Sequence, residues 1–128
     1  MPDKKIYPTP AARDHKGARS TNECLKAGRN PDTNSLGSAV CEGDVAGKLN
    51  CDWVEWLMGW PIGWTKLEPI EESNWLWLDW SADPADGDGL IPRTECGIKN
   101  HGNRLKALGN GQVPQCAAMA FMILSKGL

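Results

Sequence analysis

The residues best suited to hold a ligand lie near the C-terminal end, where Gly109-Asn110-Gly111 leads into Gln112 and Val113. Glycines on both sides of an asparagine let the backbone approach another group closely. The asparagine side chain adds two amide donors and a carbonyl acceptor at that point. A Gly-Asn-Gly segment before a helix is also a common turn or cap, so these residues by themselves leave both interpretations open.

The elements around these residues follow from local signals. A helix is predicted over residues 49–58, because Asn50 is a favourable N-cap and Asp52 complements the positive end of a helix. Gly59, with Pro61 beyond it, ends that helix.

A final helix is predicted over residues 113–125. Pro114 suits its first position, and the apolar residues Val113, Ala117, Phe121 and Leu124 follow at helical spacing. This pattern is typical of an ordinary core helix, whatever the function.

The segment at residues 49–61, followed later in the chain by Gly109-Asn110 and the final helix, resembles the C-terminal part of the cytosine-5 DNA methyltransferases, especially the bacteriophage and prophage type. Leu49-Asn50 and Met58-Gly59-Trp60-Pro61 stand at the Leu-Thr and Met-Gly-Tyr-Pro positions of the ninth conserved motif of that family. Gly109-Asn110 stands at the Gly-Asn of the tenth motif. Residues 7–14 also resemble a Pro-Thr-Pro-x-Ala-x-Asp phrase of the phage proteins.

The resemblance implies a partial domain that would complete a Rossmann-like α/β methyltransferase using S-adenosylmethionine. In that family the final helix packs beside the first strand of the cofactor-binding sheet. The enzymes flip cytosine out of the duplex, attack its C6 with a cysteine thiolate and methylate C5. The cofactor-binding residues that the resemblance implies here are Gly109, Asn110, Gly111, Gln112 and Val113.

The departures from the family are equally informative. Asp52 and Trp53 occupy the Arg-Glu positions of the ninth motif, so the ion pair that this helix usually offers is expected to be missing. The glycine-rich cofactor motif, the Pro-Cys nucleophile, the Glu-Asn-Val acid and the Gln-Arg-Arg motif have no counterpart in these 128 residues. Cys116 lies in the predicted helix among alanines, where a small buried thiol is inert. We expect no catalytic residue, and a catalytic methyltransferase polypeptide as partner.

Charge divides the chain into three parts. Residues 1–40 hold seven Lys/Arg against four acids, residues 41–90 two against eleven, and residues 91–128 five against one. The basic N-terminal part could contact phosphates of double-stranded DNA, or it could simply be a solvated surface. An acidic middle is repelled by DNA and should face solvent or a basic protein surface. The candidate DNA-binding residues are Arg13, Lys16, Arg19 and Arg29.

The predicted fold is mainly α with long irregular loops, and α+β at most. Residues 1–47 carry no sustained helical period and are predicted to be an irregular basic arm. The methyltransferase-like part, residues 48–128, consists of the helix 49–58, a tryptophan-rich acidic middle 60–92, a cofactor loop 104–113 and the final helix 113–125.

All seven tryptophans lie between residues 53 and 80. They could be stacking platforms for bases or sugars, or anchors of a small loop-rich unit. We expect a structural role for Trp53, Trp56 and Trp60. Both roles stay open for Trp75, Trp77 and Trp80.

Cysteine usage and hydropathy bear on the compartment. Five cysteines without a Cys-x-x-Cys pair argue against a disulfide framework or a zinc site. No apolar leader follows Met1, and the longest apolar run, residues 117–124, is too short to span a bilayer. We expect a cytoplasmic protein with reduced thiols, no membrane contact and no metal.

Two functions fit these observations. The first is a C-terminal fragment or subunit of a DNA (cytosine-5-)-methyltransferase, inactive alone. The second is a non-enzymatic phage module derived from that scaffold, which binds DNA or a protein. A carbohydrate-binding module is a weaker third reading, because no secretion signal accompanies the tryptophans.

Overall fold

The computed structural model describes residues 6–16, 21–28, 36–40, 48–86 and 90–127. Within these ranges the chain is mainly helical, with long irregular connections, so the prediction of a mainly α fold is confirmed. Two isolated antiparallel bridges, Leu49 with Thr94 and Ile62 with Leu76, are the β-type pairings of the described part. The helices are η1 (Ala12–Lys16), α1 (Thr21–Lys26), α2 (Leu36–Val40), α3 (Cys51–Met58), η2 (Glu72–Asn74), α4 (His101–Asn110) and α5 (Pro114–Lys126).

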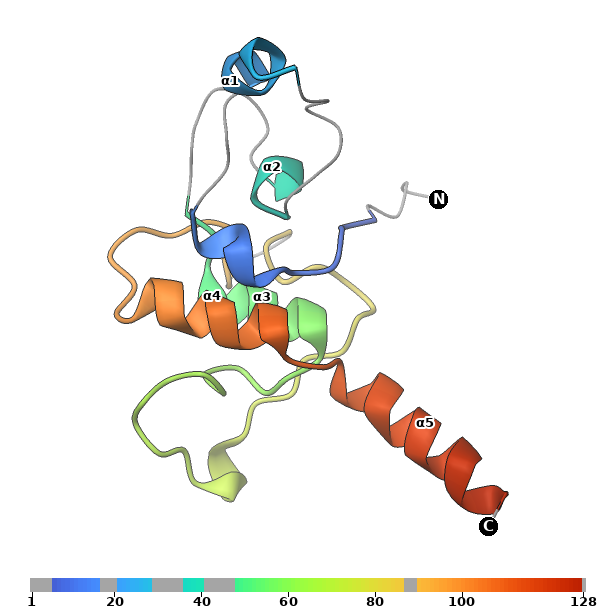
Figure 1. Cartoon of the computed structure of the whole chain (residues 1–128). Coiled ribbons are helices and arrows are strands. Elements are labelled where there is room, and N and C mark those ends of the chain that lie inside the picture. Colours follow the sequence, from blue (N-terminus) through green and yellow to red (C-terminus); the bar gives the residue numbers. More distant parts are fainter. Residues whose placement is uncertain (1–5, 17–20, 29–35, 41–47, 87–89, 128) are drawn as a thin grey trace.

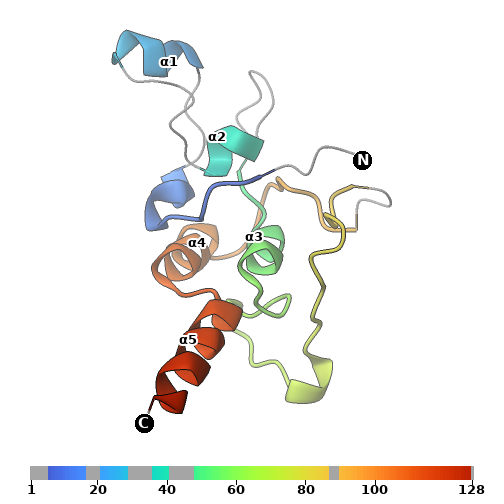
Figure 2. The same cartoon turned by 90° about the vertical axis from the view of Figure 1, so that its right-hand side faces the viewer.

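Helix α3 forms the centre of the core. It lies against α4, and α4 in turn packs beneath η1, as Figures 1 and 2 show from two directions. Most side chains of α3 are buried, so this one short helix supplies most of the apolar interior. The buried apolar residues are Leu36, Leu49, Cys51, Trp53, Val54, Trp56, Met58, Leu105 and Leu108.

The caps of α3 agree with the sequence prediction. The Asn50 side chain accepts a hydrogen bond from the Asp52 N–H at 3.1 Å, as an N-cap does. Gly59 ends the helix in the left-handed region at φ 81°, where a residue without Cβ is favoured. The helix predicted over residues 49–58 is therefore confirmed, with its first turn beginning at Cys51.

The predicted loop over residues 104–113 is wrong over most of its length. Residues 104–110 belong to α4, and only residues 111–113 connect it to α5. Tertiary packing overrides the weak helical propensity of Gly109 and Asn110. Leu105 and Leu108 are buried on one face, and Gly109 lies so close to the backbone of residues 11–12 that a Cβ would overlap it.

The final helix is present as predicted, but it is not a core helix of the described chain. Helix α5 contains no buried residue, and Phe121 is 73% exposed. Figures 1 and 2 show it projecting from the body of the molecule. No helix within the described residues is long and apolar enough to cross a membrane.

The predicted irregular arm, residues 1–47, contains three short helices where it is described. One of them, η1, is ordered by tertiary contacts. Asp14 is buried there, and its carboxylate accepts a hydrogen bond from the Ala11 N–H at 2.7 Å. Helix η1 packs against α4, where His15 lies beside Gly102.

The contact between η1 and α4 generates a stability prediction. Gly109→Ala should lower the free energy of unfolding by about 1–3 kcal/mol, because its methyl group would overlap the backbone of residues 11–12. Gly102→Ala is the matched control in the same helix. Its Cβ would meet His15 at an ordinary 3.9 Å, so the higher helical propensity of alanine should stabilise by about 0.5–1 kcal/mol. Urea unfolding of both variants measures the difference, and equal effects would contradict the proposed close contact.

Candidate functional site

The five residues expected to bind cofactor lie at the junction of α4 and α5. Gly109 and Asn110 form the last turn of α4, and Gly111 follows it with extended backbone. Gly111 N–H bonds to Leu108 O at 3.2 Å, and Val113 is the N-cap of α5. The close backbone approach expected at Gly109 exists, but the approaching group is this chain's own segment 11–12. Asn110 and Gln112 are exposed.

The two segments that carry the family resemblance meet in space. The Gln115 amide, at the start of α5, donates a hydrogen bond to Gly59 O, after α3, at 3.2 Å. A Cβ on Gly59 would overlap the Gln115 side chain. The backbone angle is what requires glycine at position 59, since the overlapping atoms are the far end of the flexible Gln115 side chain, which can shift.

A buried ion-pair cluster joins α3 to α4. Glu55 is fully buried, and its carboxylate accepts a hydrogen bond from Arg104 Nη2 at 3.1 Å. The same nitrogen bonds to Asp52 at 2.8 Å, and Arg104 Nε donates to Thr65 Oγ1 at 2.9 Å. The Glu55 carboxylate also accepts from the backbone N–H groups of Gly63 and Thr65. The family's Arg-Glu pair is missing at Asp52 and Trp53, as the sequence requires, but α3 forms ion pairs of another kind, from Asp52 and Glu55 to Arg104.

Two side chains at the cluster have shifted pKa values, Arg104 and Cys51. Burial by itself would lower the pKa of Arg104, but the hydrogen bonds that it donates to the Asp52 and Glu55 carboxylates outweigh burial and raise it. Burial raises the pKa of the neighbouring Cys51 thiol to about 11, so this cysteine stays protonated and unreactive near neutral pH.

Sequence reasoning missed the cluster, although a signal was present. Glu55 stands between Val54 and Trp56 in a helix whose neighbouring positions are apolar, and a carboxylate there needs a buried cationic partner. That signal identifies Glu55 but not Arg104.

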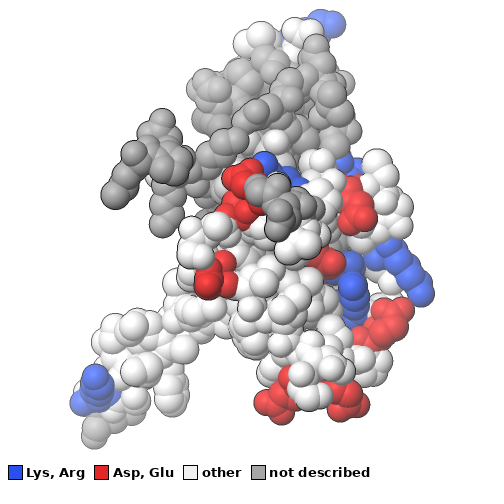
Figure 3. Space-filling model, turned by 180° about the vertical axis from the view of Figure 1, so that it is seen from behind, with Lys and Arg blue, Asp and Glu red and all other residues white. Residues whose placement is uncertain are grey.

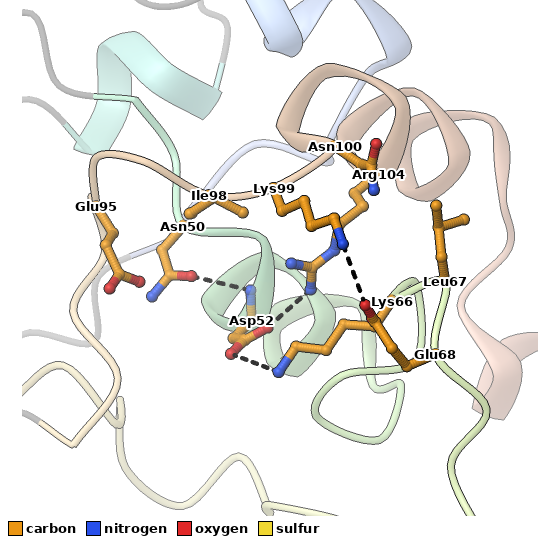
Figure 4. A pocket seen from close by; sticks show the side chains of 10 residues that line it. All are labelled: Asn50, Asp52, Lys66, Leu67, Glu68, Glu95, Ile98, Lys99, Asn100 and Arg104. Carbon is orange, nitrogen blue, oxygen red and sulfur yellow. Dashed lines mark hydrogen bonds and ion pairs between the residues drawn. The ribbon is translucent and has the colours of Figure 1, made fainter.

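A cavity of about 300 Å³ opens beside the cluster (Figure 4). Arg104 and Asp52 lie on one side, and Lys66 reaches Asp52 at 4.0 Å. Lys99 reaches Glu68 at 3.5 Å across the opening. Its three cationic residues are balanced by three acidic ones, so the cavity offers no excess charge to an anion such as a DNA phosphate. None of the five expected cofactor residues lines it.

A second polar centre, Asp83, connects three distant parts of the chain. Its carboxylate accepts hydrogen bonds from Trp53 Nε1 at 2.9 Å, from Tyr7 Oη at 3.3 Å and from Arg93 Nη2 at 2.9 Å. Burial alone would raise the pKa of Asp83, but the bonds from Trp53, the Ala85 N–H and Arg93 outweigh it and hold the pKa below its usual value.

The expected DNA-binding residues are only partly described. Arg13 and Lys16 are exposed on η1. Arg19 and Arg29 lie outside the described residues. Among the described residues, no group of three or more His, Cys, Asp or Glu side chains is arranged to hold a metal ion.

The tryptophan side chains differ in how far they are buried. Trp53 and Trp56 are buried and Trp60 half-buried, as expected for structural residues. Trp75 is half-buried, whereas Trp77 and Trp80 are exposed. Trp80 still anchors the chain, because its Nε1 donates to Trp56 O at 2.9 Å.

No family model, curated protein or solved structure matches this chain.

The buried cluster predicts a strong dependence on Arg104. Arg104→Met should lower the free energy of unfolding by about 3–5 kcal/mol, because the Glu55 carboxylate would stay buried without a cationic partner. Lys106→Met, on the exposed side of the same helix, is the control and should change stability by less than about 0.5 kcal/mol. Urea unfolding measures both, and a loss below about 1 kcal/mol in Arg104→Met would show that the cluster is dispensable.

The lowered pKa of Asp83 predicts that part of the folding stability is lost in acid. Its folded-state pKa lies below the unfolded value of about 3.9, so its contribution to stability is complete above that pH and disappears as pH falls through the folded-state pKa. Asp83→Asn should therefore destabilise the protein at neutral pH, and its difference from the wild type should shrink below about pH 4. Thermal unfolding across this range tests the prediction. A difference that is the same in acid and at neutral pH would contradict it.

Proposed function

We propose that the chain is the C-terminal segment of a DNA (cytosine-5-)-methyltransferase. It contributes DNA recognition and part of the S-adenosylmethionine pocket, and it is inactive without a catalytic methyltransferase polypeptide. The observation that carries the proposal is the uncovered helix α5, considered together with the family resemblance of the sequence.

Helix α5 has the surface of an element that belongs inside a larger protein. A helix that is apolar around its whole circumference is typically buried. Its one charged residue is Lys126, near the tip, as the pale projection in Figure 3 shows. The large apolar side chains that it exposes are Met119, Phe121, Met122, Ile123 and Leu124. In the methyltransferases that the sequence resembles, the final helix packs beside the first strand of the cofactor-binding sheet.

The contact between Gly59 and Gln115 supports the same proposal. The ninth-motif segment and the final helix are held together although they lie 56 residues apart. When a catalytic polypeptide binds α5, this contact would therefore also place α3 in a defined position relative to that polypeptide. The exposed Asn110 and Gln112, beside α5, would then face the cofactor that the partner binds.

Arg13 and Lys16 are our candidates for DNA contacts in that assembly. Both are exposed on η1, which rests on α4. Phosphate contacts from such residues would position the duplex without reading its sequence.

The second candidate function is a non-enzymatic phage module derived from this scaffold, which binds DNA or a protein. The same uncovered α5 favours it, because an apolar helix can dock on a partner that performs no methyl transfer. The two candidates differ in whether methyl transfer depends on the chain.

A methyl-transfer assay with labelled S-adenosylmethionine and duplex DNA tests the proposal. The chain alone should transfer no label, since it holds neither the Pro-Cys nucleophile nor the glutamate acid. Adding the chain to a methyltransferase polypeptide encoded beside its gene, which carries those motifs, should produce labelling. Phe121→Asp should abolish the gain by placing a charge in the apolar contact.

Lys126→Ala, at the tip of the same helix, is the matched control and should leave the gain unchanged. Labelling by the chain alone, or labelling by the partner that does not depend on the chain, would refute the proposal. Binding of a partner that requires Phe121 but is not accompanied by methyl transfer would favour the non-enzymatic module.

A further inference from the structure

The segment between α3 and Trp80 exposes aromatic side chains that the described fold leaves uncovered. We call the surface formed by Trp64, Trp75, Leu76 and Trp77 the tryptophan face. Trp64 is 42% exposed, and Leu76 and Trp77 are each 52% exposed. The rings contact one another in series, from Trp60 stacked on Trp64 at 5.1 Å, to Trp64 on Trp75 at 5.3 Å, to Trp75 on Trp77 at 6.4 Å.

Both ends of this segment are fixed to the core. The buried Glu55 accepts the Gly63 N–H at the first end, and Trp80 Nε1 bonds to Trp56 O at the second. An antiparallel bridge between Ile62 and Leu76 joins the two ends of the segment to each other. A surface held in this way loses little conformational entropy when it binds, and exposed tryptophans are the side chains that most often dominate protein contacts.

Acidic residues border the tryptophan face. Glu71 and Glu72, at the start of η2, precede Trp75 by four and three residues and are exposed. Neither forms an ion pair with any residue that the structure describes. Lys66 is the one Lys or Arg in residues 60–80 of the sequence, and it is directed at Asp52. Figure 3 shows acidic side chains gathered at the lower end of the molecule, where this segment lies.

The sign of this charge selects the partner. A surface that is acidic repels nucleic acid and attracts a cation. Exposed indole rings attract cations as well, through their electron-rich faces, and arginine more than lysine can lie flat against them. Carboxylates beside such rings complete the recognition, because a guanidinium can stack on the ring and pair with the carboxylate together.

We propose that the tryptophan face, with Glu71 and Glu72, binds an arginine-rich segment of another polypeptide. The site is separate from α5 and from the junction at residues 109–113, and it does not depend on the function proposed above. Binding of arginine gives the exposed tryptophans a role. Stacking on nucleic-acid bases suits them less, because the neighbouring carboxylates repel a phosphate backbone.

A dye-labelled hexa-arginine peptide, titrated with the full chain in fluorescence anisotropy, tests this proposal. Trp77→Ala and the double change Glu71→Gln with Glu72→Gln should each raise the Kd roughly two- to fivefold, the size expected for exposed cation–π contacts and ion pairs. Hexalysine should bind more weakly than hexa-arginine, and Trp77→Ala should affect it less. Circular dichroism verifies that each variant is folded.

Phe121→Ala, an exposed aromatic of α5, and Glu95→Gln, an exposed acid elsewhere, are the matched controls. Each should change the Kd by less than about twofold. An equal effect of Glu95→Gln and the Glu71/Glu72 double change would overturn the proposal, because it would show attraction by charge alone. An unchanged Kd in Trp77→Ala, direct binding of a labelled DNA duplex to the chain that requires Trp77, or self-association of the chain that requires Trp77 would overturn it as well.

Discussion

The described structure depends on one buried carboxylate. Glu55 is fully buried, and its only favourable environment is the one that Arg104 and the backbone of residues 63–65 create. An ionised carboxylate in an apolar interior is costly without such partners. Its bonds to Arg104 fix α4 on α3, and its bonds to Gly63 and Thr65 fix the beginning of the tryptophan-rich segment. One side chain therefore sets the relative positions of the two central helices and of the loop between them.

Asp83 performs a similar task on the opposite side of α3. It ties Tyr7 near the N-terminal end, Trp53 in the core and Arg93 before α4 to a single carboxylate. The two centres explain how a chain rich in glycine and proline, with few regular elements, keeps a defined core. Polar networks of this kind fix the arrangement of elements as well as adding stability, because only one arrangement satisfies all of their hydrogen bonds.

The sequence predicts what is locally encoded. Asn50, Gly59 and Pro114 mark the ends of α3 and α5 by capping and backbone preference, which need no tertiary context. Helix α4 could not be predicted in this way, because Gly109 and Asn110 favour a turn by themselves, and the packing of residues 11–12 against Gly109 is a tertiary contact. The candidate site shows the same limit. The position of Glu55 among apolar residues indicates a buried carboxylate, but nothing local selects Arg104 from the chain's 14 lysines and arginines.

The separation of 49 residues between Glu55 and Arg104 also constrains synthesis on the ribosome. When α3 has left the exit tunnel, its carboxylate still lacks a counter-charge, and Leu105 and Leu108 are not yet available to cover the core. Native packing of α3 must therefore wait until α4 emerges, even though the signals that start and end α3 are complete much earlier. During that interval the nascent chain presents a tryptophan-rich apolar helix to its surroundings, which is the kind of segment that chaperones shield.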